Sequence, residues 1–177
     1  VIVDGANGRQ AYTTANMTMA LFGEDDRPTW LEHPSRHRVD CVALPLDRSS
    51  LPERFAGKAI NMIGFEPRYH STVGDDCFVV GFPMGLFGQA ATPIWKRASV
   101  ATEPDGDQNG QPILLVDTAT RQGMSGSPVI VRHDGIFMPN GPTLKGDETI
   151  GTVENFLGIY SGRLGDDPLG VQLGRVW

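Results

Sequence analysis

The amino-acid sequence predicts an all-β fold. Short apolar or alternating runs recur along its 177 residues, and turn-forming residues separate them. The chain has 22 glycines and 13 prolines, which suit many tight turns. No stretch keeps an apolar stripe at the 3.6-residue spacing of a helix over three turns. We therefore expect strands in an antiparallel barrel or sandwich, with little helix.

Each predicted strand is a run of apolar, often β-branched residues between turn signals. Two longer segments rich in Gly, Asp, Asn and Pro, 103–111 and 132–151, are predicted to be exposed loops. The second of these is long enough to line a site. The predicted strands, in chain order, are 41–46, 59–65, 77–82, 97–102, 112–118, 127–132 and 155–161.

The composition limits the classes of partner. A net charge of -6 without a basic cluster argues against nucleic acid or an anionic lipid surface. No apolar run approaches the roughly 18 residues of a membrane span. With 40% hydrophobic residues, the chain can bury the core of one domain or two small ones. Proteins, peptides and small molecules remain as partners, and the cellular compartment stays open.

No metal site or cofactor is predicted. No pair of His, Cys or carboxylate residues has a recognised ligand spacing. His33 and His37 are four residues apart, but the proline beside them argues against a shared helical face. Cys41 and Cys77 lie within apolar runs and are expected to be small buried thiols, although a disulfide is not excluded by this pattern.

One segment, TRQGMSGSPVIV from Thr120 to Val131, has the pattern of a nucleophile turn. Glycines at 123 and 126 let the backbone fold sharply around Ser125 before a β-branched strand. A serine attacks a carbonyl only if a base takes its proton and fixed N–H donors receive the oxyanion. The alternative is a simple Gly/Ser turn. An α/β-hydrolase elbow is disfavoured, because Ser127 occupies the position where that motif has glycine.

The stretch DTATRQGMSGSPV resembles the nucleophile segment of the chymotrypsin-like serine peptidases, and more closely that of their bacterial trypsin-like and heat-shock-protease branch. Three further segments resemble the same family in the same order: 27–47 its acid segment, 73–86 the start of its second barrel, and 156–163 its substrate-side strand. The resemblance implies a double β-barrel that apparently lacks the first strands of the N-terminal barrel. Residues 1–72 would form the remainder of that barrel and residues 73–177 the C-terminal barrel.

The resemblance also assigns site residues. Ser125 would be the nucleophile, and the amides of Gly123 and Ser125 would form the oxyanion hole. Asp40 would orient a histidine, although Asp47, Asp75, Asp76 and Asp117 are comparable on chemistry alone. The two cysteines would lie in different barrels and therefore remain unbridged. The specificity pocket would be lined by Ala119, Thr120, Arg121, Tyr160, Ser161 and Gly162.

The resemblance also implies which substrate side chain the specificity pocket accepts, because Ala119 would lie at its floor. No carboxylate occupies Ala119, so a trypsin-like preference for Lys or Arg is not predicted. A small or apolar side chain is the expectation. Arg163 would attract an acidic side chain if it turned inward.

The chain departs from the family in its histidines. None of the four histidines lies in a segment that resembles the one carrying the family's general base; they are His33, His37, His70 and His133. In the resemblance, the position of that base would precede Val1. Truncation, disorder of the missing piece and loss of the base are the competing explanations. We expect the histidine to lie upstream of Val1, and none of the four to reach Ser125.

Two functions follow. The first is a serine endopeptidase that acts through an acyl-enzyme on Ser125. The alternative is an inactive trypsin-like module that binds peptides or proteins by strand addition. A Ser–Lys dyad has little support, since Lys58, Lys96 and Lys145 carry no motif directed at the serine.

Overall fold

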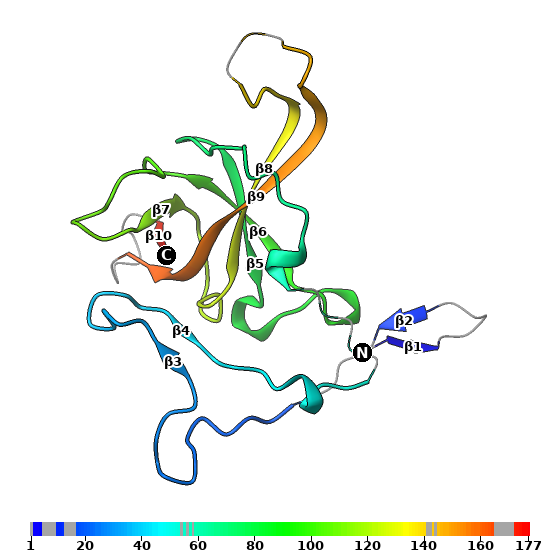
Figure 1. Cartoon of the computed structure of the whole chain (residues 1–177), viewed down its shortest axis with the longest axis vertical. Helices are drawn as coiled ribbons and strands as arrows, with labels where there is room; N and C mark the ends of the chain where they lie inside the picture. The colour runs from blue at the N-terminus through cyan, green and yellow to red at the C-terminus, as the bar shows by residue number, and fades with distance from the viewer. Residues whose placement is uncertain are drawn as a thin grey trace. The chain divides into compact units, whose positions relative to one another are not determined.

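A computed structural model describes residues 2–4, 10–12, 17–53, 55, 57, 59–140, 143, 145–164 and 172–177. In this part of the chain the protein is all-β, as predicted, and no helix reaches seven residues. The helical elements are single 3₁₀ turns, which confirms the expected scarcity of helix (Figure 1). These turns are η2 (Arg48–Ser50), η3 (Ile60–Met62), η4 (Pro83–Gly85) and η5 (Gln89–Ala91).

The chain divides into two compact units. Unit 1 comprises Val1–Ile63 and Phe87–Thr92, and unit 2 comprises Gly64–Leu86 and Pro93–Trp177. The expected boundary at 72/73 therefore falls within unit 2. Each unit is described by itself.

Unit 2 is a closed antiparallel barrel of six strands (Figure 1). Around the barrel the strands follow the order β10-β7-β6-β5-β8-β9. Closure leaves no open sheet edge where neighbouring strands pair. The strands are β5 (Asp76–Gly81), β6 (Ile94–Val100), β7 (Leu114–Asp117), β8 (Pro128–Phe137), β9 (Thr149–Arg163) and β10 (Leu173–Val176).

The barrel core follows from alternation along the strands. On β5, Cys77 and Val79 are completely buried while their neighbours are more exposed, which is the period-2 pattern of a half-buried strand. Tyr160 and Met124 are the largest of the fully buried side chains. The aliphatic remainder of this cluster includes Val100, Val116, Val129, Val131, Val153 and Val176.

Residues 64–72 belong to unit 2 because they pack on β9. The rings of Phe65 and Phe156 stack with their centroids 6.4 Å apart. Asn155 Nδ2 donates to Tyr69 O at 3.0 Å, and the Tyr69 hydroxyl donates to Asp75 Oδ2 at 2.8 Å. These contacts fasten the segment to the barrel before β5 begins.

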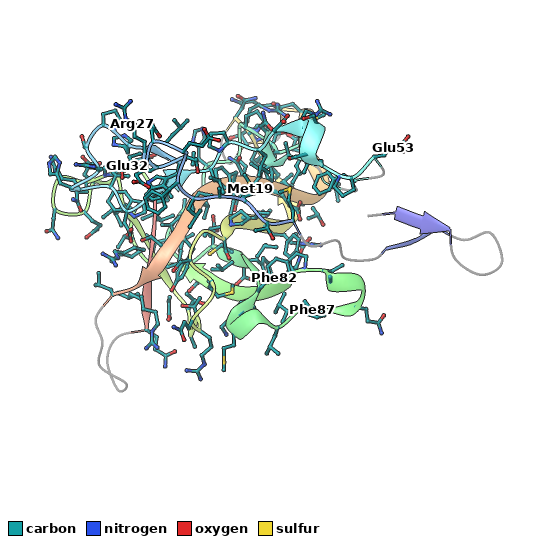
Figure 2. All side chains as sticks on the ribbon, turned by 90° about the horizontal axis from the view of Figure 1, so that it is seen from below. Met19, Arg27, Glu32, Glu53, Phe82 and Phe87 are labelled. Atoms are coloured by element: carbon teal, nitrogen blue, oxygen red, sulfur yellow. The ribbon has the colours of Figure 1, made fainter. Side chains whose placement is uncertain are left out.

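Unit 1 contains two two-stranded sheets. One pairs β1 (Ile2–Asp4) with β2 (Gln10–Tyr12), and the other pairs β3 (Leu31–Glu32) with β4 (Val42–Ala43). None of the residues whose burial is described in this unit is buried. Figure 2 draws their side chains, of which Met19, Arg27 and Glu32 are labelled.

Two sequence predictions fail within unit 1. The run 59–65 is not a strand, because residues 60–62 form the η3 turn. The run 41–46 contributes only Val42–Ala43 to a strand. Apolar residues alone do not make a strand when no neighbouring strand supplies hydrogen bonds.

The predicted loop 132–151 is wrong at its two ends. β8 continues to Phe137 and β9 begins at Thr149, so residues 132–137 and 149–151 belong to a long hairpin (Figure 1). Gly135 and Gly151 are paired across this hairpin with φ of 140° and 148°. Only glycine adopts such φ values easily. These two glycines indicated a loop in the sequence, but in the structure they bend two paired strands.

Both cysteines are free, as expected. Cys77 is buried in the barrel, but Cys41 in unit 1 is only half-buried, so the prediction of a buried thiol fails there. Among the described residues, no helix has the length and apolar character to cross a membrane. The same residues include no group of three or more His, Cys, Asp or Glu that could hold a metal ion.

Candidate active site

The turn around Ser125 is built by two glycines. Gly123 and Gly126 have φ of 89° and 85°, which is the region that favours glycine. Ser127 N donates to Met124 O at 3.0 Å and closes the turn. Met124 is fully buried, whereas Ser125 is exposed. The turn is thus anchored in the core by Met124 and presents the next side chain to solvent.

Close backbone packing fixes this turn against the end of β5. Met84 N donates to Gln122 O at 2.7 Å. A Cβ at Gly123 would lie 3.0 Å from Phe82 O, and one at Gly81 would lie 2.0 Å from Ser127 Oγ. Both positions therefore need glycine, which explains part of the GFPMG and GMSG patterns.

The Ser125 side chain lies beside the last part of β9. Its Oγ donates to Ser161 O at 3.2 Å. Gly126 N donates to Tyr160 O and Tyr160 N donates to Ser127 O, both at 2.8 Å. A Cβ on Gly162 would stand 3.9 Å from Ser125 Oγ. The structure thus brings Ser125, Tyr160, Ser161 and Gly162 together.

Two backbone amides of the turn are unused. In the described part of the chain, the N–H groups of Gly123 and Ser125 donate no hydrogen bond. Both residues are exposed. Amides held by a glycine turn are suited to receive negative charge on an oxygen atom.

The predicted pocket residues divide between surface and core. Ala119 and Arg121 are exposed, and Thr120 is buried. Thr120 Oγ1 shares a hydrogen bond with the Tyr160 hydroxyl inside the barrel. Burial raises the pKa of Tyr160, while the Thr120 bond lowers it. Thr120 and Tyr160 therefore contribute to the core, and Ser161 and Gly162 form the part next to Ser125.

Sequence analysis missed the residues of β10. Arg175 pairs with Gly162 across β9 and β10, and Trp177 Nε1 donates to Ser161 Oγ at 3.1 Å. The strand is only four residues long and holds one glycine and one arginine, so its apolar alternation is weak. Only its pairing partners reveal that it belongs to the site.

Asp40 lies in unit 1 and is exposed, whereas Ser125 belongs to unit 2. Among the histidines of unit 2, His133 contacts Ile136 O through Nε2 at 3.3 Å, and its ring packs on Tyr69 at 5.7 Å. Within the described residues of this unit, no histidine hydrogen-bonds to Ser125. In unit 1, His33 Nδ1 accepts from Ser35 N at 3.0 Å.

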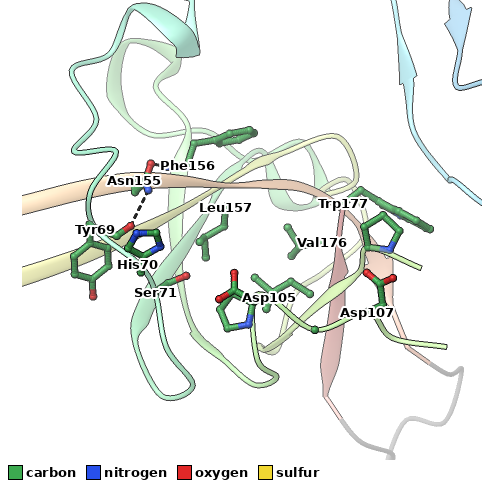
Figure 3. Close-up of a pocket in the computed structure, with 14 residues that line it drawn as sticks. Tyr69, His70, Ser71, Asp105, Asp107, Asn155, Phe156, Leu157, Val176 and Trp177 are labelled. Carbon is green, nitrogen blue, oxygen red and sulfur yellow. Dashed lines mark hydrogen bonds between the residues drawn. The ribbon is translucent and has the colours of Figure 1, made fainter. Parts of the chain in front are cut away.

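A cavity of about 280 Å³ opens elsewhere on unit 2 (Figure 3). His70 and Ser71 come from the segment before β5, and Asp105 and Asp107 come from the 103–111 loop. Leu157 and Trp177 are also among its lining residues, but Ser125 is not. Histidine 70 therefore faces this cavity and not the serine turn.

Comparisons of the chain with protein-family models, with curated proteins and with solved structures gave no match.

Proposed function

We propose that the chain is a serine endopeptidase of the chymotrypsin-like type, with Ser125 as its nucleophile. The observation that carries the proposal is the turn of residues 123–126. It exposes one hydroxyl beside two unused amides, on a closed antiparallel barrel.

The proposed reaction uses each group in turn. Ser125 Oγ attacks the carbonyl carbon of a peptide bond while its proton passes to a histidine imidazole, and the carbonyl oxygen becomes an oxyanion. The amides of Gly123 and Ser125 donate to that oxyanion. The imidazolium then protonates the leaving amine, which leaves an acyl group on Ser125. Water deprotonated by the same histidine releases the acyl group and restores the serine.

Asp40 is proposed to accept a hydrogen bond from the histidine and to stabilise its charged form. The histidine itself is proposed to precede Val1. Ser125 Oγ donates to Ser161 O at 3.2 Å, longer than the usual 2.7–2.8 Å or so for a hydroxyl donor. Such a bond is weak, so exchange for a stronger base costs little.

The edge of β9 supports binding of an extended peptide. The pairing of β8 with β9 ends at Ile159. The next residue, Tyr160, hydrogen-bonds through its backbone to Gly126 and Ser127 of the serine turn. Residues 161–163 pair only with β10 among the described strands. A peptide strand can therefore add to the free side beside Ser125. The same edge favours the second candidate, an inactive module that binds peptides by strand addition.

Labelling with a fluorophosphonate separates the two candidates. In the full-length protein we expect covalent modification at Ser125, located by mass spectrometry against its neighbour Ser127. Ser125→Ala should abolish the label and peptide hydrolysis. Its free energy of unfolding should change by at most about 1 kcal/mol, because one weak hydrogen bond is lost. Peptide binding without any label would favour the module, and unchanged hydrolysis by Ser125→Ala would eliminate the nucleophile.

A further inference from the structure

The cavity of unit 2 drawn in Figure 3 has an apolar floor and a polar rim. Its floor includes Leu114, Leu157 and Val176, which belong to the barrel core or pack against it. A volume of about 280 Å³ lies just below the range of roughly 300–1,000 Å³ of small-molecule sites, so the cavity suits a ligand of side-chain size. The rim carries polar groups on exposed or half-buried residues, namely His70, Ser71, Asp105 and Asp107.

These four polar side chains have no partner within the protein. In the described part of the chain, none of them forms a side-chain hydrogen bond or an ion pair. The two carboxylates carry negative charge, and neither lysine nor arginine is among the described residues that line the cavity. The chain therefore leaves this negative charge uncompensated, which favours a ligand with positive charge.

Backbone hydrogen bonds hold the loop that carries both carboxylates. Gln108 N donates to Gln111 O at 2.9 Å, and Gln111 N donates to Gln108 O at 3.0 Å. Between them Asn109 and Gly110 have φ of 53° and 69°, the combination that a two-residue type I′ turn requires. A further backbone bond at 3.1 Å closes the turn over residues 103–106. The carboxylates start from a defined backbone, so a ligand has little of this loop to order.

Trp177 forms an aromatic wall of the cavity, and its position is fixed. Its Nε1 donates to Ser161 Oγ at 3.1 Å, and its backbone exchanges two hydrogen bonds with Ile159 at 2.7 and 3.0 Å. Figure 3 shows Asp107 on the side of Trp177 and His70 on the opposite side. An indole ring beside carboxylates favours a guanidinium group, which is planar, stacks on aromatic faces and is more weakly hydrated than an ammonium group.

We propose that this cavity binds an arginine side chain presented by a peptide segment of a protein partner. Asp105 and Asp107 attract its guanidinium group, which lies against Trp177, and its methylene groups lie over the apolar floor. The unused imidazole and hydroxyl groups of the rim can bind the N–H and C=O groups of a peptide backbone, which favours a peptide over a free cation. Ser125 does not line the cavity, so the proposal does not depend on the peptidase function.

The first experiment titrates acetyl-Gly-X-Gly-amide peptides into the full-length protein and measures binding by calorimetry. X is arginine or citrulline, which has nearly the same shape without the charge. We expect the arginine peptide to bind about ten-fold more tightly, with a difference that falls as salt increases. Equal affinities of the two peptides would overturn the proposal without any variant.

Variants then assign the preference to the two carboxylates. Asp105→Asn and Asp107→Asn should each weaken binding of the arginine peptide about two- to five-fold, because both carboxylates are exposed and screened by solvent. Combined, they should bring its affinity to within about two-fold of that of the citrulline peptide. The matched control is Asp117→Asn, which removes an exposed carboxylate of β7 outside the cavity and should change neither affinity. A full preference in the double variant would contradict the assignment.

Trp177 reports where the peptide binds. The chain has three tryptophans, and the substitutions Trp30→Phe and Trp95→Phe leave Trp177 as the only one. The arginine peptide should change the emission of Trp177, with the dissociation constant that calorimetry gives for the same variant. Binding without any change in this emission would place the peptide outside the cavity and overturn the proposal.

Two further titrations separate this proposal from the peptidase function and from binding of a free cation. Ser125→Ala should bind the arginine peptide with unchanged affinity, whether or not the protein hydrolyses peptides. Weaker binding by this variant would place the peptide at the serine turn and overturn the proposal, whereas absent hydrolysis would concern only the peptidase function. Butylguanidinium, which lacks a peptide backbone, should bind more weakly than the arginine peptide. Equal or tighter binding would contradict the choice of a peptide.

Discussion

The two units of the chain differ in what holds them together. Unit 2 closes six strands into a barrel around a buried cluster. Unit 1 has only two-stranded sheets, and several large apolar side chains are exposed there, among them Phe22, Leu31, Val42 and Met62. Both units contain apolar residues, but only the barrel gives them a common interior. Closure of the strands, and not hydrophobic content, therefore decides where the core forms.

The proposed function takes only Asp40 from unit 1, whereas Ser125 and the oxyanion-hole amides belong to unit 2. The largest effect that we expect tests the role of Asp40. Asp40→Asn should reduce kcat of the full-length protein by a factor on the order of 10⁴, because the histidine would lose the acceptor that fixes its tautomer. Stability should change little, since Asp40 is exposed.

The control for this prediction is Asp47→Asn. Asp47 accepts from Ser49 N at 2.9 Å and caps the η2 turn, so its loss should weaken this turn without lowering kcat. Peptide hydrolysis measures kcat, and urea denaturation followed by circular dichroism measures stability. An unchanged rate for Asp40→Asn would remove unit 1 from the proposed chemistry.

Matched truncations of aromatic side chains measure the difference in packing. Tyr160→Ala in the barrel should lower the free energy of unfolding by about 3–5 kcal/mol, because it leaves a cavity and an unpaired Thr120 hydroxyl. Phe22→Ala in unit 1 should cost about 1 kcal/mol or less, since Phe22 is 55% exposed and its ring makes an edge-on contact with Trp30. Urea titrations compare the two. Equal costs would contradict the distinction between the units.

The two thiols give the smallest effect and the simplest measurement. Burial, with the charges of Asp76 and Asp75 as lesser causes, raises the pKa of the Cys77 thiol to about 12. Cys41 is half-buried. At pH 8 a bulky thiol reagent should therefore modify Cys41 in the native protein and Cys77 only after unfolding.

The same shift sets a pH dependence. A thiol in the unfolded chain ionises near pH 8.5 or so, whereas native Cys77 keeps its proton up to about pH 12. The unfolded state therefore binds fewer protons between these values, and stability should fall as pH rises through that range. Cys77→Ser tests this by urea titration at pH 8 and pH 10. A wild-type decrease no larger than that of the variant would contradict the assignment to Cys77.

The sequence predicted the barrel well and unit 1 poorly, for a physical reason. In 77–82 and 127–132 each strand has partners on both sides, so local alternation and long-range pairing agree. The run 59–65 looks equally strand-like, but its residues 60–62 form the η3 turn. Strand pairing depends on segments far away in the sequence, and the run itself does not show whether such a partner is present.

The site shows the same division. Ser125 and Gly123 are marked by the spacing of glycines, which the turn requires locally. Arg175 has no local mark, and only the register of β10 against β9 brings it beside Gly162. The extension of β8 and β9 through Gly135 and Gly151 was missed because glycine in a sequence indicates a turn more often than a paired bend.

β10 has a consequence for the order of events during synthesis. It joins β7 to β9, and its neighbour Trp177 exchanges two hydrogen bonds with Ile159 at 2.7 and 3.0 Å. The strand follows every other barrel strand in the chain, so the ribosome delivers it after all of them. Until then the barrel has two open edges, and neither Arg175 nor Trp177 has reached its partner on β9, Gly162 or Ser161. A nascent chain therefore carries its proposed nucleophile for some time before the surroundings that would use it exist.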